Sequence, residues 1–430
     1  MAQKLKNITI YDVLMYIAIL FSGTDIWSFN IGVNIRFIQI LYVVILLIYI
    51  IKYKPIIKWS SSYFFIFILI FIINSIISTI FSLNFMHSFL YFTWIIYSVL
   101  ILIPMFYIYI KNVGVKKLKI IFRAVAISMF LLIIFQFLLD GILKIELPIF
   151  SSQHFQGVTR VALWFYEPSY LATFMSIFVS FFSYYVFIRK EYYLIPEFIA
   201  SVISLLLTTS TTGFLIIFVI FLVVLFTRIR MVSNFEKKLI ILLIAIIAIF
   251  ASLLIAALFF RSVFDKFIMR IFNQGITAAS GDRMNDYGNQ IRAFFYAPLF
   301  GVGLDCYGVF VGDPNIVASN ITLELLATMG IFGMVSFYAI IVYLFYETFL
   351  SIRAKKYNFS RVVVFSTIIL LVALQANQNF MRVYLWMMIS ISYGAIVFEK
   401  NIFSEDEIKE NNEEIIKESN EDKIDNIVLQ

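Results

Sequence analysis

The sequence predicts an all-α fold, a polytopic transmembrane helical bundle of about twelve spans with a large, partly helical extracytoplasmic loop. Of the 430 residues, 62% are hydrophobic and 14% are charged, and mean hydropathy is +0.96, a composition typical of membrane proteins. Apolar stretches of roughly 17 to 25 residues recur, and each can cross a hydrocarbon core of about 30 Å as a helix. They are apolar all round, which argues against the alternating strands of a β-barrel.

The expected spans are joined by short connections except at two places. Loops at about residues 140–167 and 260–320 are longer than a connection requires. The seventh and eighth spans are separated by Thr208–Gly213, whose hydroxyls and glycine favour a tight turn or a broken helix, although one long helix is the alternative. The expected spans are residues 11–29, 35–51, 62–81, 88–110, 119–139, 168–188, 194–208, 212–227, 239–259, 321–347, 362–376 and 381–398.

The distribution of charge predicts an orientation. Residues 399–430 carry 11 acidic residues and 4 lysines, which predicts an acidic, disordered cytoplasmic tail after a membrane domain at 1–398. With both termini in the cytoplasm, 20 of the 29 basic residues outside the tail fall on the cytoplasmic side, as the positive-inside rule requires. The first span is expected to be a retained helix, because no small-residue cleavage site follows it. We therefore expect a multi-pass protein of the bacterial cytoplasmic (inner) membrane.

The loop at about 140–167 offers an arginine and a carboxylate. Pro168 fits the first turn of a helix, so Glu167 falls at or near the cap of the sixth span, at the outer mouth of the membrane domain. An acidic cap near the positive end of the helix dipole is one explanation of Glu167, and a functional carboxylate is the other. Arg160 either pairs with a carboxylate such as Glu167 or holds an anion.

The second loop contains the best candidate anion site. Ser280-Gly281-Asp282 is typical of a helix start, and the helix is expected to run to about Tyr296 before Pro298. Free N–H groups at such a start suit phosphate, and Arg283 adds a planar set of donors at the same end. Arg292 lies nine residues further on and points about 180° away, so both arginines cannot face one ligand on a straight helix.

Further candidates border this loop, and none suggests a metal or cofactor. Asn320 and Glu324 share one helix face at the start of the tenth span, and Arg382 is another external arginine at a span mouth. The histidines, His87 and His154, are expected to be isolated, and no Cys and His spacing resembles a zinc site. Asp282 and Asp286 share a face at i,i+4, but a cap and a solvated carboxylate explain them better than a divalent metal. A chain this apolar is not expected to bind nucleic acid.

Several segments, taken in chain order, match the pattern of a known family. They span about residues 150 to 335, and their order within the expected topology is more specific than any one of them. The segments are Arg160 with Glu167-Pro168-Ser169, Thr209-Ser210-Thr211-Thr212-Gly213, Gly281-Asp282-Arg283, Pro298-Leu299-Phe300-Gly301-Val302-Gly303-Leu304, Ser319-Asn320-Ile321-Thr322-Leu323-Glu324-Leu325-Leu326 and Met329-Gly330-Ile331-Phe332-Gly333.

With these segments the chain resembles the bacterial superfamily of Wzy-type oligosaccharide repeat-unit polymerases and O-antigen ligases. The resemblance implies glycosyl transfer at the outer face of the membrane, from a polyprenyl-diphosphate-linked oligosaccharide donor to an acceptor hydroxyl. It implies membrane lipid as a further partner and allows a chain-length regulator and a flippase, with no cofactor. Arginines in the family's external loops engage the diphosphate, a role that carries over to Arg160 and Arg283.

One position departs from the family pattern. Ligase-like members commonly have histidine before the asparagine of the span-opening motif, and this chain has Ser319 there. A serine cannot be the same general base at neutral pH, so Glu167 or Glu324 would have to help, and a polymerase is favoured over a ligase. We expect catalytic roles for Arg283, Arg160, Glu167 and Glu324, and substrate contacts for Asn320, Arg292, Arg382, Gly301 and Gly303.

Three alternatives to a polymerase stay open. A ligase would use the same chemistry and transfer a finished glycan to a lipid acceptor. A flippase or transporter of lipid-linked oligosaccharide would need a polar pathway through the membrane, yet the expected spans are nearly free of ionisable residues at mid-depth. The third alternative is a non-catalytic membrane scaffold.

Overall fold

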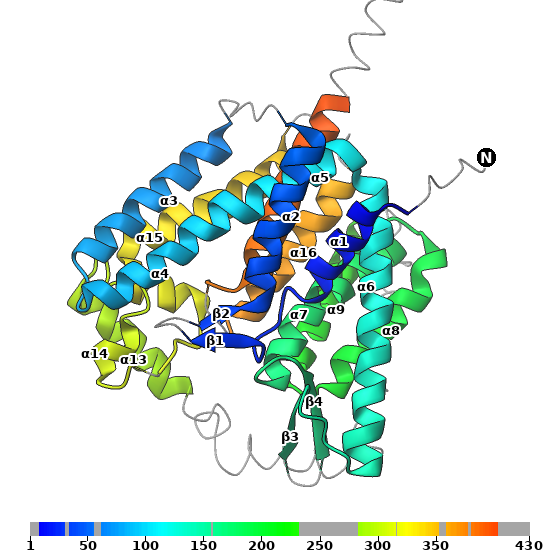
Figure 1. Ribbon diagram of the computed structural model, residues 1–430, viewed down its shortest axis with the longest axis horizontal. Coiled ribbons are helices and arrows are strands. Elements are labelled where there is room, and N and C mark those ends of the chain that lie inside the picture. Colours follow the sequence, from blue (N-terminus) through cyan, green and yellow to red (C-terminus); the bar gives the residue numbers. More distant parts are fainter. Residues whose placement is uncertain are drawn as a thin grey trace, which may run out of the picture.

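The computed structural model describes residues 8–30, 34–55, 62–155, 158–231, 283–314, 316–351, 358–376 and 380–402. It is a bundle of packed helices with two short antiparallel hairpins at one end (Figure 1). This confirms the predicted fold class, although neither hairpin was predicted. The first half of the chain forms α1 (Ile10–Leu20), β1 (Ser28–Asn30), β2 (Asn34–Arg36), α2 (Phe37–Tyr53), α3 (Tyr63–Ile80), α4 (Phe85–Tyr97), η1 (Ser98–Leu102), α5 (Ile103–Val113), α6 (Val115–Gln136), η2 (Phe137–Leu143), β3 (Ser151–Phe155), β4 (Val158–Leu163), α7 (Pro168–Ser183) and η3 (Tyr184–Ile188).

The second half follows the same pattern of apolar helices. It forms η4 (Tyr192–Leu194), α8 (Ile195–Leu207), α9 (Thr211–Met231), α13 (Arg283–Tyr296), α14 (Tyr307–Val311), α15 (Ile321–Phe345), η5 (Tyr346–Leu350), α16 (Phe359–Leu374) and a helix over residues 383–402. Within the described residues, six helices are long and apolar enough to cross a membrane, and shorter apolar helices accompany them. Many large apolar side chains are exposed on the flanks, as lipid-facing surfaces require, so the chain is a multi-pass membrane protein.

Most predicted spans agree with the helices. The predicted break is confirmed, because α8 ends at Leu207, Thr209 adopts a left-handed conformation and α9 begins at Thr211. The first helix is shorter than predicted and ends at Leu20. The hydroxyls of Ser22 and Thr24 donate to the carbonyls of the helix end, which favours leaving the helix. The predicted span at 239–259 and most of the predicted tail lie outside the described residues.

Helix α7 is the centre of the bundle. Of its most apolar window, 89% is buried inside the protein, against 22% for α9 and 33% for α3. It packs against α8, α9 and α16. Hydroxyl residues recur along α7 at intervals of three and four, and their oxygens bond to the helix's own carbonyls. Small side chains of this kind allow neighbouring helices to approach closely.

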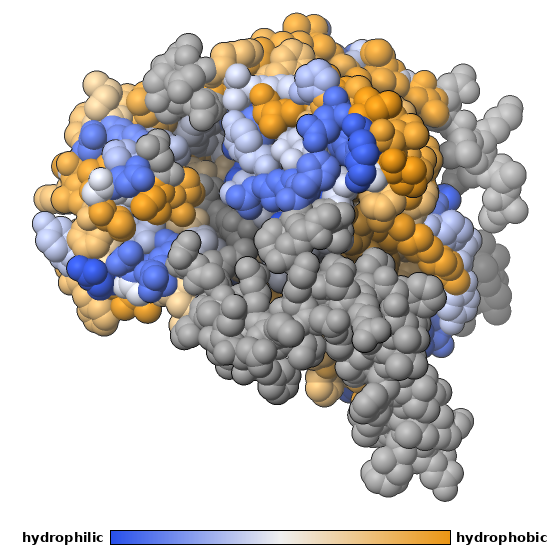
Figure 2. Space-filling model, turned by 90° about the horizontal axis from the view of Figure 1, so that it is seen from below, coloured by the Kyte–Doolittle hydropathy of each residue, from blue (hydrophilic) through white to orange (hydrophobic). Residues whose placement is uncertain are grey.

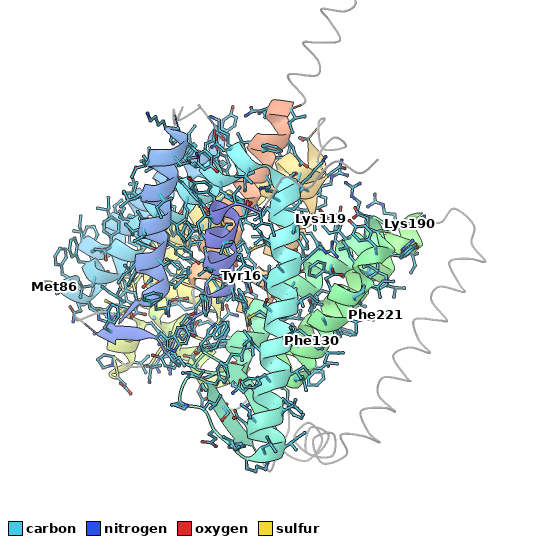
Figure 3. The ribbon with its side chains drawn as sticks, turned by 45° about the vertical axis from the view of Figure 1, so that its right-hand side comes forward. Tyr16, Met86, Lys119, Phe130, Lys190 and Phe221 are labelled. Atoms are coloured by element: carbon cyan, nitrogen blue, oxygen red, sulfur yellow. The ribbon has the colours of Figure 1, made fainter. Side chains whose placement is uncertain are left out.

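The two ends of the bundle differ. The hairpins, α13 and α14 lie at the lower end in Figure 1, which we call the hairpin end. Seen from that end, hydrophilic side chains form separate areas bordered by hydrophobic surface (Figure 2). Lys119 and Lys190 lie toward the opposite end, which we call the basic end, while Phe130 and Phe221 lie on the apolar flank (Figure 3).

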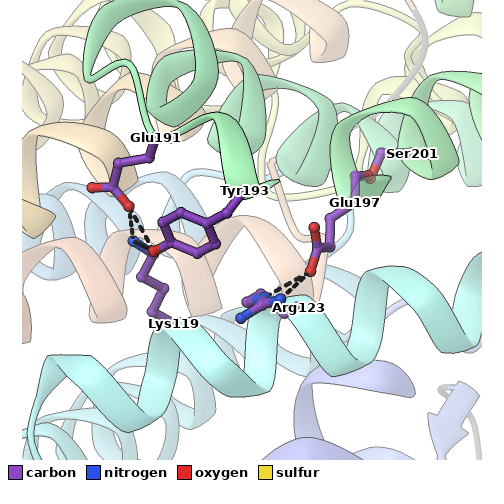
Figure 4. Close-up of polar contacts among 6 residues, drawn as sticks. All are labelled: Lys119, Arg123, Glu191, Tyr193, Glu197 and Ser201. Atoms are coloured by element: carbon purple, nitrogen blue, oxygen red, sulfur yellow. Dashed lines mark hydrogen bonds and ion pairs between the residues drawn. The ribbon is translucent and has the colours of Figure 1, made fainter. Parts of the chain in front are cut away.

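At the basic end, ion pairs fasten α6 to the segment before and within α8 (Figure 4). Arg123 contacts Glu197 at 2.6 Å, and Lys119 contacts Glu191 at 2.5 Å. Glu197 is buried, and its second oxygen, Oε2, has no hydrogen-bond partner among the described residues. At the same end the helix over 383–402 runs past the predicted domain boundary, and Glu399 accepts hydrogen bonds from the first amides of α16.

Replacing Arg123 tests how much its ion pair with Glu197 contributes to the stability of the protein. Arg123→Ala is expected to destabilise the protein by about 1 to 3 kcal/mol, because it leaves the buried Glu197 carboxylate without its partner. Lys116→Ala is the control, since Lys116 is an exposed residue of the same helix. The measurement is thermal unfolding of both variants in detergent, and equal midpoints would show that the pair adds nothing.

A buried glutamine holds the hairpin of β3 and β4 against the bundle. The Gln136 side chain donates to the Ser151 carbonyl and to Asp140 Oδ2, both at 2.9 Å, and accepts from the Leu163 amide at 2.8 Å. One side chain at the end of α6 thus binds both strands, and it fixes the direction in which the chain enters Glu167 and α7.

Candidate functional site

A buried carboxylate at the hairpin end binds two arginines. Asp25 follows α1 and is 2% exposed. Its Oδ1 lies 2.7 Å from Arg382 Nη1 and 3.0 Å from Arg36 Nη2. The Asp25 amide donates to the Trp164 carbonyl at 3.0 Å, which ties this cluster to the segment between β4 and α7. Two guanidinium groups on one carboxylate leave a surplus of one positive charge. We call these three residues the arginine cluster.

Arg382 was predicted as a site residue, whereas Asp25 and Arg36 were missed. The Arg382 guanidinium lies over the Tyr170 ring at 4.3 Å from its centre, in a cation–π contact. Arg382 Nε and Asp25 Oδ2 are buried without a hydrogen-bond partner in the described structure. Tyr170 interacts electrostatically with Arg382 and with Glu167, so it links the arginine cluster to the first loop.

Arg160 and Glu167 are the predicted site residues of the first loop. The structure confirms that Glu167 is the cap position of α7, with Pro168 in the first turn. Glu167 is exposed, and its Oε2 accepts from Ser169 Oγ at 2.9 Å. Burial lowers the pKa of Arg160, and the charge of Glu167 opposes that shift. Among the described residues no carboxylate lies within ion-pair distance of Arg160, and its Nη1 is 3.5 Å from Gln153 Oε1.

Helix α13 matches the helix predicted in the second loop. It runs from Arg283 to Tyr296, while the predicted start at Ser280–Asp282 and the side chain of Arg283 lie outside what the structure describes. One turn after Arg283, the Tyr287 hydroxyl lies 3.5 Å from the Gln375 carbonyl. The start of α13 therefore lies beside the segment that leads to Arg382. Arg292 is exposed, and its Nη1 lies 3.3 Å from Asn289 of the same helix.

Asp286 has a role that the sequence did not suggest. It was expected to be a solvated carboxylate, but it accepts hydrogen bonds from the hydroxyls of Tyr307 and Ser319 and from Gln290 Nε2 at 2.7 Å. It also accepts from the Ser319 amide at 3.1 Å. Burial raises the pKa of Tyr307, and its hydrogen bond to Asp286 raises it further. Asp286 thus joins α13 to the start of α15 and fixes Ser319.

Asn320 and Glu324 contact the same neighbouring segment, as their spacing predicts. Asn320 caps α15 by accepting from the Leu323 amide at 2.9 Å, and its Nδ2 donates to the Gln375 carbonyl at 2.7 Å. Glu324 is 2% exposed, and its Oε2 accepts from the Phe380 amide at 3.1 Å. Glu324 interacts electrostatically with Arg382 and with Asp305, so it lies next to the arginine cluster.

Gly301 and Gly303 form a turn that packs on backbone. Both have positive φ, +73° and +107°. A Cβ at Gly301 would lie 2.2 Å from the carbonyl carbon of Thr328, and one at Gly303 would lie 2.2 Å from Ser82 Cβ. The turn is hydrogen-bonded to α15: the Val302 amide donates to the Ala327 carbonyl at 2.9 Å. This contact lies just before the kink of α15 at Gly330. The contacts explain why glycine is required, and substrate binding by these residues stays a prediction.

The expectation that both histidines are isolated is wrong. His87 Nε2 lies 3.0 Å from Asp305 Oδ2, and His154 Nε2 lies 2.9 Å from Glu146 Oε1. His87 and Asp305 are 218 residues apart, so no local pattern could have paired them. Among the described residues, no group of three or more His, Cys, Asp or Glu side chains is arranged to hold a metal ion.

Part of the chain is similar to a known protein family. Residues 198–338 match the Wzy_C family model, described as O-antigen ligase, and this is 141 of the 430 residues. No curated protein matches the chain. The match covers Arg283, Asp305, Asn320 and Glu324, while Arg160 and the arginine cluster lie outside it. Residues 198–338 are thus similar to the O-antigen ligase family, which supports the predicted resemblance to the superfamily of Wzy-type polymerases and O-antigen ligases over that segment.

Proposed function

We propose that this protein polymerises polyprenyl-diphosphate-linked oligosaccharide repeat units into a surface polysaccharide of O-antigen or capsule type. The hairpin end then faces out of the cytoplasm, at the outer face of the bacterial cytoplasmic membrane, and both termini lie inside. The observation that carries the proposal is the arginine cluster, in which Arg36 and Arg382 both contact the buried carboxylate of Asp25.

The excess positive charge suits a lipid diphosphate. Arginine presents a planar set of donors to phosphate oxygens, and its attraction for an anion is stronger where the site is partly buried. Arg382 Nε is buried and has a proton to donate, with no acceptor among the described residues. Arg160 and Arg283 are the further proposed ligands, at the first loop and at the start of α13. Asn320, Arg292, Gly301 and Gly303 are proposed to line the path of the glycan.

The proposed reaction is a displacement at the anomeric carbon of the donor sugar. The acceptor hydroxyl oxygen forms a bond to that carbon, and the bond from the carbon to the diphosphate oxygen breaks. The electron pair of the broken bond stays on the diphosphate, where the arginines stabilise the developing charge. The acceptor hydroxyl passes its proton to a base at the site as the new bond forms, and Glu167 or Glu324 assists by orienting that hydroxyl. No metal is assigned to any step.

A ligase is the second candidate, because the matching family model is described as O-antigen ligase. The two activities differ in the acceptor. The deciding experiment supplies the purified protein in liposomes with lipid-linked repeat units alone and then with a separate lipid acceptor, each with and without chelator. Longer chains from repeat units alone support the polymerase. Transfer only to the added acceptor would replace it with the ligase, and no transfer in any arm would overturn the proposed function.

Arg283 provides a variant test of the anion site. Arg283→Ala is expected to abolish polymer while membrane abundance stays near wild type, because a guanidinium at the start of α13 would be lost from the diphosphate. Arg292→Lys is expected to have a milder effect, since Arg292 is exposed, contacts only Asn289 among the described residues and keeps its positive charge as lysine. Chain length is read on gels, with abundance by immunoblot. Normal chains in Arg283→Ala would remove the assigned role, and a stronger defect in Arg292→Lys would reverse the assignment.

A further inference from the structure

A histidine and an aspartate meet at the edge of the candidate site. His87 lies in the first turn of α4, where Asn84 caps the helix through the His87 amide. Its Nε2 is 3.0 Å from Asp305 Oδ2, and the side chains are 29% and 14% exposed. His87 Nδ1 has no hydrogen-bond partner in the described part of the chain. With its proton on Nε2, the ring donates to Asp305 and presents a lone pair at Nδ1.

The glycine turn fixes the partner of this histidine. Asp305 follows Gly303 by two residues and itself has a positive φ of 54°. The turn is tied to the connection between α3 and α4, through Leu83 N to Val302 O at 2.9 Å and Cys306 Sγ to Asn84 O at 3.6 Å. Cys306 is a free, buried cysteine. These contacts hold Asp305 beside α4, so the aspartate can orient the His87 ring.

The pair faces the charged residues that the proposed function uses. The Tyr91 ring packs on the His87 ring with centres 5.1 Å apart. Tyr91 interacts electrostatically with Asp305, the partner of His87, and also with Arg36 and Glu324 of the candidate site. Asp305 also interacts electrostatically with Glu324. The turn before Asp305 pairs with Ala327 on α15, three residues after Glu324, so the pair of His87 and Asp305 lies at the edge of the candidate site.

The carboxylates proposed to orient the acceptor hydroxyl each already accept a hydrogen bond from the protein. Glu324 is 2% exposed and accepts from the Phe380 amide, and Glu167 accepts from the Ser169 hydroxyl. The Ser319 hydroxyl donates to Asp286. His87 is the partly exposed imidazole at this end that has a lone pair available.

We propose that His87 is the general base of the transfer and that Asp305 is its positioning residue. The inference rests on the proposed function. As the acceptor oxygen bonds to the anomeric carbon, the hydroxyl proton passes to His87 Nδ1, while the electron pair of the breaking bond leaves with the diphosphate. Asp305 stabilises the imidazolium through Nε2–H. The imidazolium then returns its proton to water, which restores the neutral ring.

The test uses the full-length protein in liposomes with lipid-linked repeat units. His87→Gln is expected to lower kcat about 100-fold or more, with the KM for the donor little changed, because general-base catalysis contributes about 10² to 10⁴. Asp305→Asn is expected to lower kcat as well, because the amide changes the tautomer that the ring prefers. His154→Gln is the matched control, since His154 also contacts a carboxylate but lies on β3.

Chemical rescue separates a base from a structural contact. Added imidazole is expected to restore turnover to His87→Ala and to leave His87→Gln and the control unchanged. Unfolding midpoints are measured for each variant, and His87→Gln supplies the answer if His87→Ala does not fold. Turnover of His87→Gln within twofold of wild type, or rescue that fails in a folded His87→Ala, would overturn the assignment of the base. An inactive wild-type protein would instead contradict the proposed function itself.

Discussion

Gly330→Ala is expected to prevent accumulation of the folded protein. Gly330 lies at the kink of α15 with φ 66° and ψ −167°, a region that is open essentially to glycine alone. Such a conformation costs a residue with a side chain on the order of 1–3 kcal/mol. The added Cβ would also lie 2.3 Å from the carbonyl carbon of Leu299. Because that neighbour is backbone, it cannot turn aside as a side chain would.

A second glycine provides the matched control for this prediction. Gly288 lies in α13, and a Cβ there would meet nothing within 4 Å. Gly288→Ala is expected to be neutral or to stabilise by up to about 1 kcal/mol, because alanine loses less conformational entropy in a helix. Yield and unfolding midpoint are measured by size-exclusion chromatography in detergent after heating. A stable Gly330→Ala protein would show that the kink can relax without glycine.

Asp25→Asn is expected to remove both stability and transfer activity. Asp25 is the carboxylate that Arg36 and Arg382 share, and the amide would leave two cations close together without a counter-charge. Breaking a buried ion pair from one side costs about 3 to 5 kcal/mol. Arg36→Gln is expected to cost less than about 1 kcal/mol, since Arg36 is the more exposed partner and Asp25 would still pair with Arg382.

A double-mutant cycle tests whether the stability lost in Asp25→Asn comes from unpaired charge. If the cost comes from unpaired charge, combining Asp25→Asn with Arg382→Gln is expected to recover part of the stability but none of the transfer activity. Unfolding midpoints and polymer formation in liposomes are measured for both single variants and the double variant. Strictly additive losses would show that Asp25 and Arg382 act independently.

The helices were predictable because few backbone conformations can satisfy their hydrogen bonds in a lipid environment. Every amide in the hydrocarbon core needs a partner within its own segment, so long apolar runs become helices. The break at Thr209 was visible in local chemistry, as was the cap at Glu167. The end of α1 was not, because Ile26 and Trp27 kept the sequence apolar after the helix had ended.

The candidate site was predictable only where one segment carries the signal. The shared helix face of Glu324 and Asn320 follows from helical spacing, whereas the predicted opposed directions of Arg283 and Arg292 stay a prediction. No local sequence pattern marks Asp25 or Arg36 as a site residue, because an aspartate that follows a helix and an arginine that precedes one are both common. Their contact with Arg382 depends on how distant helices pack, which periodicity does not encode.

The contact between Asp25 and Arg382 joins residues 357 positions apart. Asp25 is synthesised with the first helix, whereas Arg382 precedes the last described one. The surplus positive charge that we propose for diphosphate binding is therefore assembled only when the final helix has entered the membrane and docked. A chain still emerging from the ribosome has no complete arginine cluster, so under the proposed function a partly inserted protein would be unable to bind lipid-linked sugar.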